Sequence, residues 1–362
     1  MNSQQFCELA SRLVRVPTAP YHEHGVRDVV EEICAENGLE FERDPFGNVL
    51  VRLQTSRGQR PFVLAAHMDH PGFEVIRKLS GNRWLARFQG DVGDSHFRTG
   101  IPVRLMPGGI PGKLGPRRGK NKTFEIHAAH SAEHPFKFAV WELEDFAVRR
   151  GMIHARGCDD VVGVAAILAA MIELKQSRAR ANVIGVISRA EEIGFRGALM
   201  VAMKSEVPKN SLIVSLETSR ELPGVKMGHG VILRVGDRTS VFDSDGMRFL
   251  AEVATGISKK RNDFQFQRAL MSGGTCEATA YQEFGYQTTA VCIALGNYHN
   301  CGDGNRIKAE YVSVSDACSM VDLLVAAAKE MRNFKKLTLK LPARLNQMGR
   351  EAEAKLRSTA ED

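Results

Sequence analysis

Cysteine is scarce in this chain and follows no regular pattern. The 362 residues include seven cysteines, an odd number without even spacing. Small domains held together by disulfides carry paired cysteines and occur in oxidising compartments. The cysteine content therefore argues against a disulfide framework and favours reduced thiols in a cytoplasmic protein.

The N-terminus lacks the features of a targeting segment. Residues 1–16 contain no basic start and no long apolar run. A signal peptide needs both features, and a membrane-spanning helix needs about 20 mostly apolar residues. We therefore expect no signal peptide, no membrane span and no membrane partner. The sequence also contains no internal repeat.

A strong excess of one charge is also lacking, although the net charge is +7. Five basic residues lie among glycine and proline at 113–122, and more follow residue 335. A solvated loop and a solvated tail explain this uneven excess better than a nucleic-acid site. Nucleic-acid binding rests on net charge alone, so we expect no nucleic-acid partner.

The remaining composition is that of an ordinary globular protein, with 43% hydrophobic and 25% charged residues. This is enough for a large core and two domains. Helical and strand periods alternate along most of the chain, which is typical of a mixed or parallel sheet with helices on its faces. We therefore predict an α/β fold with a mixed sheet flanked by helices. The predicted helices are residues 3–16, 22–37, 161–174, 195–204, 245–259 and 310–331, and the predicted strands are 48–53, 61–66, 182–188, 211–216 and 287–295.

The residue pattern of the sequence changes between residues 73 and 152. Glycine, proline and short alternating segments replace the helical periods there. This pattern predicts a small β-barrel-like domain inserted into the main one. Residues beyond 341 are charged, and we expect them to form a loose tail. The predicted organisation is a discontinuous main domain at 1–72 and 153–341, an inserted β-rich domain at 73–152 and a charged tail at 342–362.

Two adjacent carboxylates, Asp159 and Asp160, precede a run of small apolar residues at 164–170. That run predicts a buried helix, and an acidic pair entering it is costly unless something positive binds the pair. Capping of the helix explains one carboxylate but not two. A divalent metal ion would explain both.

Acidic residues or histidine follow apolar strands at several other places. Taken singly, each signal is weak. His67 could be a satisfied buried histidine, and Glu217 a surface residue. Glu191 and Glu192 could mark a helix start. Because open α/β sheets place their sites at the carboxyl ends of strands, the whole set suits two zinc ions at one edge. The set comprises His67, Asp69, Asp159, Glu191, Glu192, Glu217 and His299.

Short motifs built on these residues resemble those of a known family. The motifs are His67-Met68-Asp69, Asp159-Asp160-x-x-Gly163, Glu191-Glu192-Ile193-Gly194-x-Arg196-Gly197-Ala198, Gly228-x-Gly230, Gly273-Gly274-Thr275 and Tyr298-His299. They are similar to those of the glutamyl and leucyl aminopeptidases of the tetrahedral (TET) type, metallopeptidase family 42. The resemblance spans about residues 1–335, and the wider clan of co-catalytic zinc exopeptidases shares the ligand order.

The resemblance implies a role for each metal ligand. Asp159 would bridge two metal ions. His67 and Glu217 would complete the coordination of one ion, and Glu192 and His299 that of the other. The main domain would then be a catalytic domain with a dinuclear metal site.

The resemblance also implies roles for three neighbouring acids. Glu191 would be the general base, which takes a proton from a metal-held water and returns it to the leaving amine. Asp69 would accept the second ring proton of His67 and so fix its tautomer. Asp160 would follow Asp159 through a strained peptide, and a cis bond is one form of such strain.

Four positions depart from the family pattern. Glu217 stands where aspartate is usual, and its longer arm would change the geometry or affinity of that metal site. His70, Val161 and Cys276 stand where the family usually has Glu, Arg and Asp. In relatives the segment before Cys276 borders the substrate pocket. The candidate substrate-binding residues are therefore Gly273, Gly274 and Thr275.

The implied function is that of an aminopeptidase that cleaves peptides with two divalent metal ions. Zinc is expected, with cobalt or manganese as alternatives. Relatives often form closed dodecamers through the inserted domain, so a homo-oligomer is implied. Two alternatives stay open: an amidohydrolase of the same clan, acting as an N-acyl amino acid deacylase or a carboxypeptidase, and an inactive metal-binding scaffold. The retained Glu191 argues against the scaffold, which needs no base.

Overall fold

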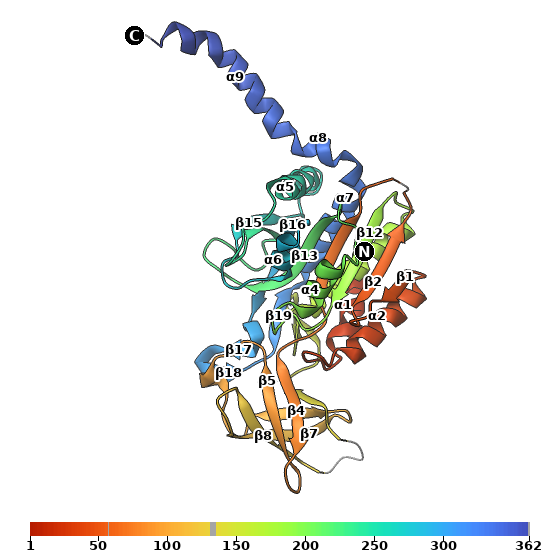
Figure 1. Cartoon of the computed structure of the whole chain (residues 1–362), viewed down its shortest axis with the longest axis vertical. Coiled ribbons are helices and arrows are strands. Elements are labelled where there is room, and N and C mark those ends of the chain that lie inside the picture. Colours follow the sequence, from red (N-terminus) through yellow and green to blue (C-terminus); the bar gives the residue numbers. More distant parts are fainter. Residues whose placement is uncertain (57, 131–134, 361–362) are drawn as a thin grey trace.

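A computed structural model describes residues 1–56, 58–130 and 135–360. A large sheet with helices on its faces forms the upper body, and a closed barrel lies below it (Figure 1). The sheet has 11 strands, of which nine lie in the order β1-β2-β12-β3-β13-β16-β19-β11-β10, while β14 and β15 extend from β16. The sheet begins with β1 (Glu40–Arg43) and β2 (Val49–Gln54), and β14 (Val231–Gly236) pairs with β15 (Phe266–Leu270).

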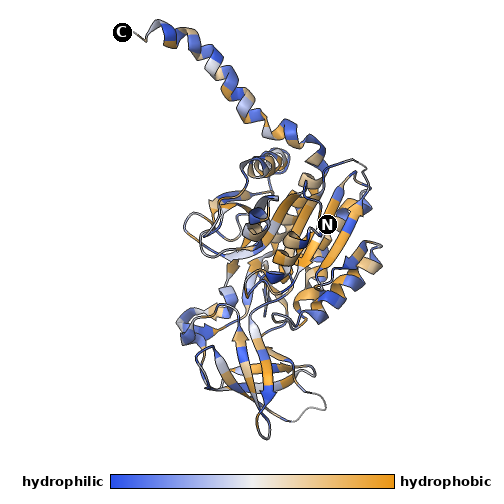
Figure 2. Ribbon diagram, in the orientation of Figure 1, coloured by the Kyte–Doolittle hydropathy of each residue, from blue (hydrophilic) through white to orange (hydrophobic). Residues whose placement is uncertain are grey.

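The centre of the sheet consists of parallel strands. β3 (Phe62–His67) lies between β12 (Asn182–Ser188) and β13 (Leu212–Arg220), and β13 pairs with β16 (Gln287–Gly296). All six residues of β3 are buried, as a continuous apolar strand covered on both faces must be. β2 pairs antiparallel with β12, so the sheet is mixed, and the predicted fold class is confirmed. The apolar colour of these strands is visible in Figure 2.

Helices cover both faces of this sheet. One face packs against α1 (Ser3–Val14), α2 (His24–Glu36), α3 (Val161–Gln176), α5 (Ser244–Ser258) and α7 (Val314–Glu330). The other face packs against α4 (Arg196–Lys204) and α6 (Glu277–Glu283). α3 has no polar face along most of its length because α1, α7 and β3 surround it.

The inserted segment contains a closed six-stranded barrel in the order β4-β5-β8-β7-β6-β9. Its own core is aromatic: the rings of Phe73 and Trp141 meet edge to face with centroids 4.9 Å apart. The predicted barrel-like architecture is confirmed. The barrel strands are β4 (Gly72–Lys78), β5 (Arg83–Gln89), β6 (Pro102–Met106), β7 (Ile110–Arg117), β8 (Thr123–Ala128) and β9 (Phe138–Trp141).

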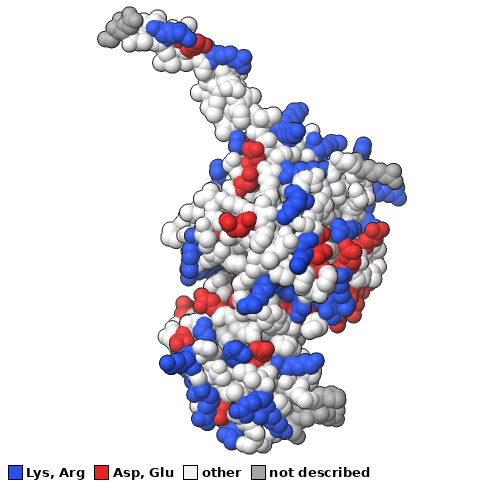
Figure 3. All heavy atoms as spheres, in the orientation of Figure 1, with Lys and Arg blue, Asp and Glu red and all other residues white. Residues whose placement is uncertain are grey.

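The predicted domain boundaries stay a prediction, although the strand pairings show which segments belong to the large sheet and which to the barrel. β10 (Ala147–Arg149) lies before residue 152 but pairs with β11 (Met152–Ala155) in the large sheet. The basic segment 113–122, expected to be a loop, begins inside strand β7. Lys and Arg side chains gather over the barrel face seen in Figure 3.

The C-terminal part of the chain differs from the prediction in two ways. The expected helix 310–331 begins instead as strand β19 (Glu310–Ser313), and Ser313 caps α7 by accepting from the backbone of Asp316. The expected loose tail, residues 342–362, is helical over most of α9 (Lys340–Ser358), which follows the short helix α8 (Phe334–Thr338), and residues 361–362 lie outside the described residues. Good helix formers and the pair Glu353–Arg357 support α9, which projects from the body (Figure 1).

Within the described ranges, no helix is long and apolar enough to cross a bilayer. All seven cysteines are free thiols.

Candidate metal centre

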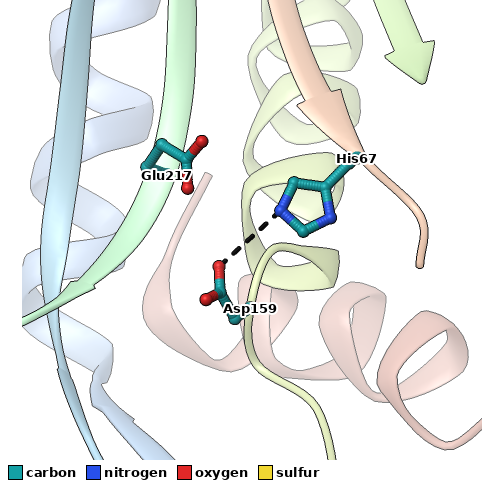
Figure 4. Close-up of side chains that lie close together, drawn as sticks. All are labelled: His67, Asp159 and Glu217. Atoms are coloured by element: carbon teal, nitrogen blue, oxygen red, sulfur yellow. Dashed lines mark ion pairs between the residues drawn. The ribbon is translucent and has the colours of Figure 1, made fainter. Parts of the chain in front are cut away.

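The topology brings the predicted site residues to one edge of the sheet. His67 is the last residue of β3, and Glu217 lies in β13. Glu191 and Glu192 follow β12, and His299 lies in the turn after β16. Asp159 reaches the same place from the loop before α3, as the close-up shows for His67, Asp159 and Glu217 (Figure 4).

The candidate ligand atoms form overlapping groups, and Asp159 belongs to two of them. His67, Asp159 and Glu217 each offer an atom within 4.8 Å of the others. Asp159, Glu192 and His299 do the same. The Oδ1 of Asp159 lies 3.8 Å from Nε2 of His67, and its Oδ2 lies 3.6 Å from Nε2 of His299. A carboxylate that points one oxygen at each group has the geometry of a bridging ligand.

Several oxygens of this cluster have no partner in the described part of the chain. Oδ1 of Asp159, Oε1 of Glu192 and Oε1 of Glu217 are buried and accept no hydrogen bond there. Buried charged oxygens without partners are costly. Divalent cations would remove this cost, and histidine with carboxylate is a donor set that zinc accepts. The residues present therefore fit two metal ions.

A third group of potential ligands places Glu191 beside the cluster. His67, Glu191 and Glu192 offer atoms within 4.8 Å of one another. Oε2 of Glu191 lies 3.9 Å from Nε2 of His67, and the side chain is 10% exposed. Glu191 thus lies beside the candidate metal ligands and also lines the cleft next to them.

Asp160 does not act as a helix cap. It occupies the N-cap position of α3, but its side chain makes no capping hydrogen bond, and both of its carboxylate oxygens are buried without a partner among the described residues. The peptide bond between Asp159 and Asp160 is cis. Burial raises the pKa of Asp160 well above its usual range, and the charge of Glu217 adds to that rise.

Asp69 contacts the cluster differently from the expected way. Nδ1 of His67 lies 3.1 Å from the backbone carbonyl of Asp69 and 3.5 Å from its carboxylate. The carboxylate accepts hydrogen bonds from the backbone N–H groups of Glu191, at 2.9 Å, and Glu192, at 3.1 Å. Asp69 therefore positions the turn that carries these two acids as well as the ring of His67.

Glu310 is a second positioning carboxylate, which the sequence analysis missed. Its Oε2 accepts from the backbone N–H groups of Cys158, at 2.7 Å, and Asp159, at 3.1 Å. Its Oε1 accepts from the backbone N–H of His299 at 2.8 Å. In the sequence it is only an acid three residues before the helix cap Ser313, and its full burial is visible only in the structure.

His70, one of the departures from the family pattern, supports the same backbone. Its Nδ1 lies 3.0 Å from the carbonyl oxygen of Asp159, and its Nε2 lies 3.0 Å from Oδ1 of Asn300. The imidazole thus links the loop that carries Asp159 to the turn that carries His299. We assign this histidine a structural role on these contacts.

The pKa shifts of these residues indicate that added positive charge would stabilise the cluster. Burial raises the pKa of Glu191 well above its usual range, and His67 opposes this while Glu217 adds to it. Burial also raises the pKa of Glu217 to about 8. Burial alone would lower the pKa of His67, but Asp69 and Glu191 outweigh it, and the pKa lies well above its usual range. Without a cation the cluster therefore retains protons, which metal ions would displace.

A cleft of about 50 Å³ opens over this cluster. Its wall includes the three candidate substrate-binding residues and two arginines, Arg220 and Arg234, that the sequence analysis did not select. Cys276 lies in the same wall but belongs to none of the candidate ligand groups of the described residues. The lining residues include Asp159, Glu191, Glu217, Arg220, Arg234, Gly273, Gly274, Thr275 and Cys276.

Comparison with known proteins gives a family match and several similar structures. The M42 glutamyl aminopeptidase family matches residues 134–321. The Pyrococcus horikoshii TET1 peptidase, described as assembling into a tetrahedron or a large octahedral shell, superposes with a TM-score of 0.74 at 23% identity, covering 90% of this chain and 99% of that one. A TET aminopeptidase from a marine sediment Thaumarchaeota archaeon gives a TM-score of 0.77 at 18% identity, covering 92% and 100%.

A curated protein matches a shorter segment. The cytosol non-specific dipeptidase of Escherichia coli is 29% identical over 72 residues, which cover 19% of this chain and 15% of that protein. The structural likenesses, at identities below 25%, show a shared fold.

Proposed function

Because the chain belongs to the M42 glutamyl aminopeptidase family, we propose that it is a metal-dependent aminopeptidase that hydrolyses the N-terminal peptide bond of peptides. One observation carries the proposal: Asp159 lies between two groups of candidate ligands, and Glu191 lies beside both. A structural metal site needs no such additional acid. The arrangement suits hydrolysis by a metal-held water.

The ligands would divide as the two groups suggest. His67 and Glu217 would hold one metal ion, Glu192 and His299 the other, and Asp159 both. Bound metal ions would act as Lewis acids and would lower the pKa of a bound water molecule. Zinc fits the donor set best, with cobalt or manganese as alternatives. Glu310 and Asp69 would keep the ligand backbones in place.

Glu191 is the proposed general base. It lies at the cleft and at the ligand cluster together, and burial raises the pKa of its carboxyl group. A carboxylate in this position can take a proton from water and return it to the leaving amine. The free α-amine of a peptide would lie near the carboxylates, while Gly273, Gly274 and Thr275 border its N-terminal residue.

Assembly into a homo-oligomer is part of the proposal. One similar structure is described as a dodecamer and another as a tetrahedron or octahedral shell. We propose that residues 73–152 form a distinct domain of this chain and provide subunit contacts. Light scattering of the full chain tests this, since a monomer at all working concentrations would contradict it.

Hydrolysis of a panel of aminoacyl-anilides and their N-acetyl forms tests the activity. The purified protein is assayed with chelator and then with zinc, cobalt or manganese restored. Metal-dependent cleavage of only the free-amine forms is expected. Cleavage of only the blocked forms would instead indicate a deacylase of the same clan. An intact fold without cleavage of either form would indicate a metal-binding scaffold.

A further inference from the structure

The helix α9 carries an apolar stripe that the described part of the chain leaves uncovered. No residue of α9 is buried, and four large apolar side chains of the stripe are 45% to 67% exposed. Consecutive members of the stripe are three or four residues apart, so they lie on one face of the helix. Figure 1 shows α9 projecting from the body. The stripe comprises Leu341, Leu345, Met348, Ala352 and Leu356.

The link between α9 and the body is helical rather than loose. The N–H of Leu339 donates to the carbonyl of Lys335 at 3.1 Å, and the N–H of Ala343 donates to the carbonyl of Leu339 at 3.0 Å, so α8 continues into α9. A helix in water owes most of its stability to the packing of its apolar face, and Gly349 in the middle of α9 lowers its helix propensity. An exposed apolar stripe that is held away from the body therefore indicates a partner.

The charges beside the stripe indicate what kind of partner fits. Arg344 and Glu351 lie two turns apart along the same edge of the stripe. When a second copy of α9 runs in the opposite direction, with its Met348 against Leu345, the arrangement is two-fold symmetric. Arg344 of each copy then meets Glu351 of the other, which gives two pairs of opposite charge. The helix is therefore complementary to itself in the antiparallel direction.

Other arrangements fit less well. A parallel pair places Arg344 beside Gly349 of the second copy and Glu351 beside Leu356, so no opposite charges meet. A membrane surface suits a helix that has a basic polar face and aromatic anchors. α9 contains no aromatic residue, and Glu351 and Glu353 lie outside its stripe. A second, antiparallel copy is the partner that these residues favour.

A cavity at the base of the stripe has room for the end of a second helix. Followed back into α8, the face of the stripe carries Phe334 and Thr338. Both line a cavity of about 870 Å³, and Met331 and Leu339 add apolar surface to its wall. In the antiparallel register, Leu356 of the second copy lies level with α8. The cavity thus offers an apolar place for the end of that helix.

We infer that α9 is a self-association helix, whose stripe is covered by the stripe of a second copy that runs antiparallel. Leu345 packs against Met348 of the other copy, and Leu341 packs against its Ala352, in both directions. A helix pair of this length is a small interface, so it strengthens an assembly and adds little to the stability of each body. The inference goes beyond the proposed peptidase activity and does not depend on it.

Photo-cross-linking of the full chain tests the pairing. Leu341→p-benzoylphenylalanine places a photoreactive side chain in the stripe, where Ala352 of the second copy should lie. Irradiation should give a covalent dimer, and mass spectrometry should map the link to the peptide around Ala352. Within one chain these positions lie about 16 Å apart along the helix, so such a link joins two copies. Ala343→p-benzoylphenylalanine, on the opposite face, should not link to that peptide.

A charge swap tests the register of the pair. Added to the photoreactive chain, Arg344→Glu brings like charges together twice and should lower the yield of dimer at least about fivefold. Glu351→Arg in the same chain restores opposite charges and should restore the yield. Arg350→Glu, the same change on the opposite face, should leave the yield unchanged. All these residues are exposed, so the body should fold in every variant.

The possible results separate this pairing from its alternatives. A link to the peptide around Leu341 of the second copy would indicate a parallel pair, and a link to residues 1–330 would indicate that α9 packs on a body. Either result overturns the inference. So does the absence of a dimer, and binding of the full chain to anionic phospholipid vesicles would then indicate a membrane helix. If light scattering still finds an oligomer without this link, the proposed contact through residues 73–152 stands while the α9 pairing fails.

Discussion

The carboxylate of Glu310 accepts a hydrogen bond from the backbone N–H of His299 at 2.8 Å. Its other oxygen accepts from the backbone N–H groups of Cys158 and Asp159. One buried acid thus fixes the backbones of two candidate ligands that lie far apart in sequence. Asp69 does the same for Glu191 and Glu192. These two supporting carboxylates therefore position the backbone segments that carry the candidate ligands.

Replacement of Glu310 should therefore damage both stability and metal binding. In Glu310→Ala three buried N–H groups lose their acceptor, and each such loss costs about 1–3 kcal/mol. We expect a much lower urea midpoint and a loss of bound zinc. Asp303→Asn, at an exposed acid in the turn that follows His299, should leave both unchanged. Full zinc occupancy in both variants, Glu310→Gln and Glu310→Ala, would contradict the positioning role.

Glu191→Gln should separate catalysis from metal binding. The amide keeps the shape and the backbone contacts with Asp69 but cannot accept a proton from water. We expect a fall in kcat of at least about 100-fold with unchanged zinc content. Enzyme assays and metal analysis on the same preparation measure both quantities. Activity close to that of the wild type would remove Glu191 from the role of base.

Asp159→Asn should give the opposite pattern. Asp159 points one oxygen toward each group of ligands, and an amide cannot bind two metal ions in that way. We expect loss of metal as well as of activity, measured by zinc analysis after dialysis against buffer. Two zinc ions per chain in this variant would defeat the bridging assignment.

Much of the site could be predicted because open α/β sheets place their sites at the carboxyl ends of strands. His67 and Glu217 were selected because they end or follow apolar strands, and those strands are visible in the local sequence. Glu310 was missed because the short strand before α7 has the apolar pattern of a continuing helix. Arg234 was missed because β14 was not predicted, and its place beside Glu217 depends on strand pairing across distant segments. Side-chain partners such as the backbone donors to Asp69 depend on turns that no local pattern specifies.

The C-terminal helix should contribute little to the stability of the body. None of the residues in α9 is buried, and the expected loose tail is instead an exposed helix. A chain that ends after Leu339 should unfold within about 2 °C of the full chain, since surface changes cost little. Differential scanning calorimetry in the presence of zinc measures this. A fall of more than about 5 °C would show that α9 packs against the protein in solution.

Glu277 gives a prediction for the pH dependence of the metal-free protein. Its side chain is fully buried on α6, Oε1 accepts a hydrogen bond from Ser188, and Oε2 has no partner within the described ranges. Burial raises its pKa from 4.5 to about 7 in the folded state. The folded protein therefore holds a proton that the unfolded chain releases as pH rises above its ordinary pKa.

The sign of this linkage determines the expected result. The contribution of Glu277 is complete below pH 4.5 and is lost as pH rises to about 7. The loss amounts to about 3 kcal/mol at most. In chelator, Glu277→Gln should match the wild type near pH 5 and exceed its urea stability near pH 8. Glu283→Gln, at an exposed acid on the same helix, should show no such gain in urea stability between pH 5 and pH 8. A constant difference between Glu277→Gln and the wild type across this range would show that Glu277 is ionised in the folded protein.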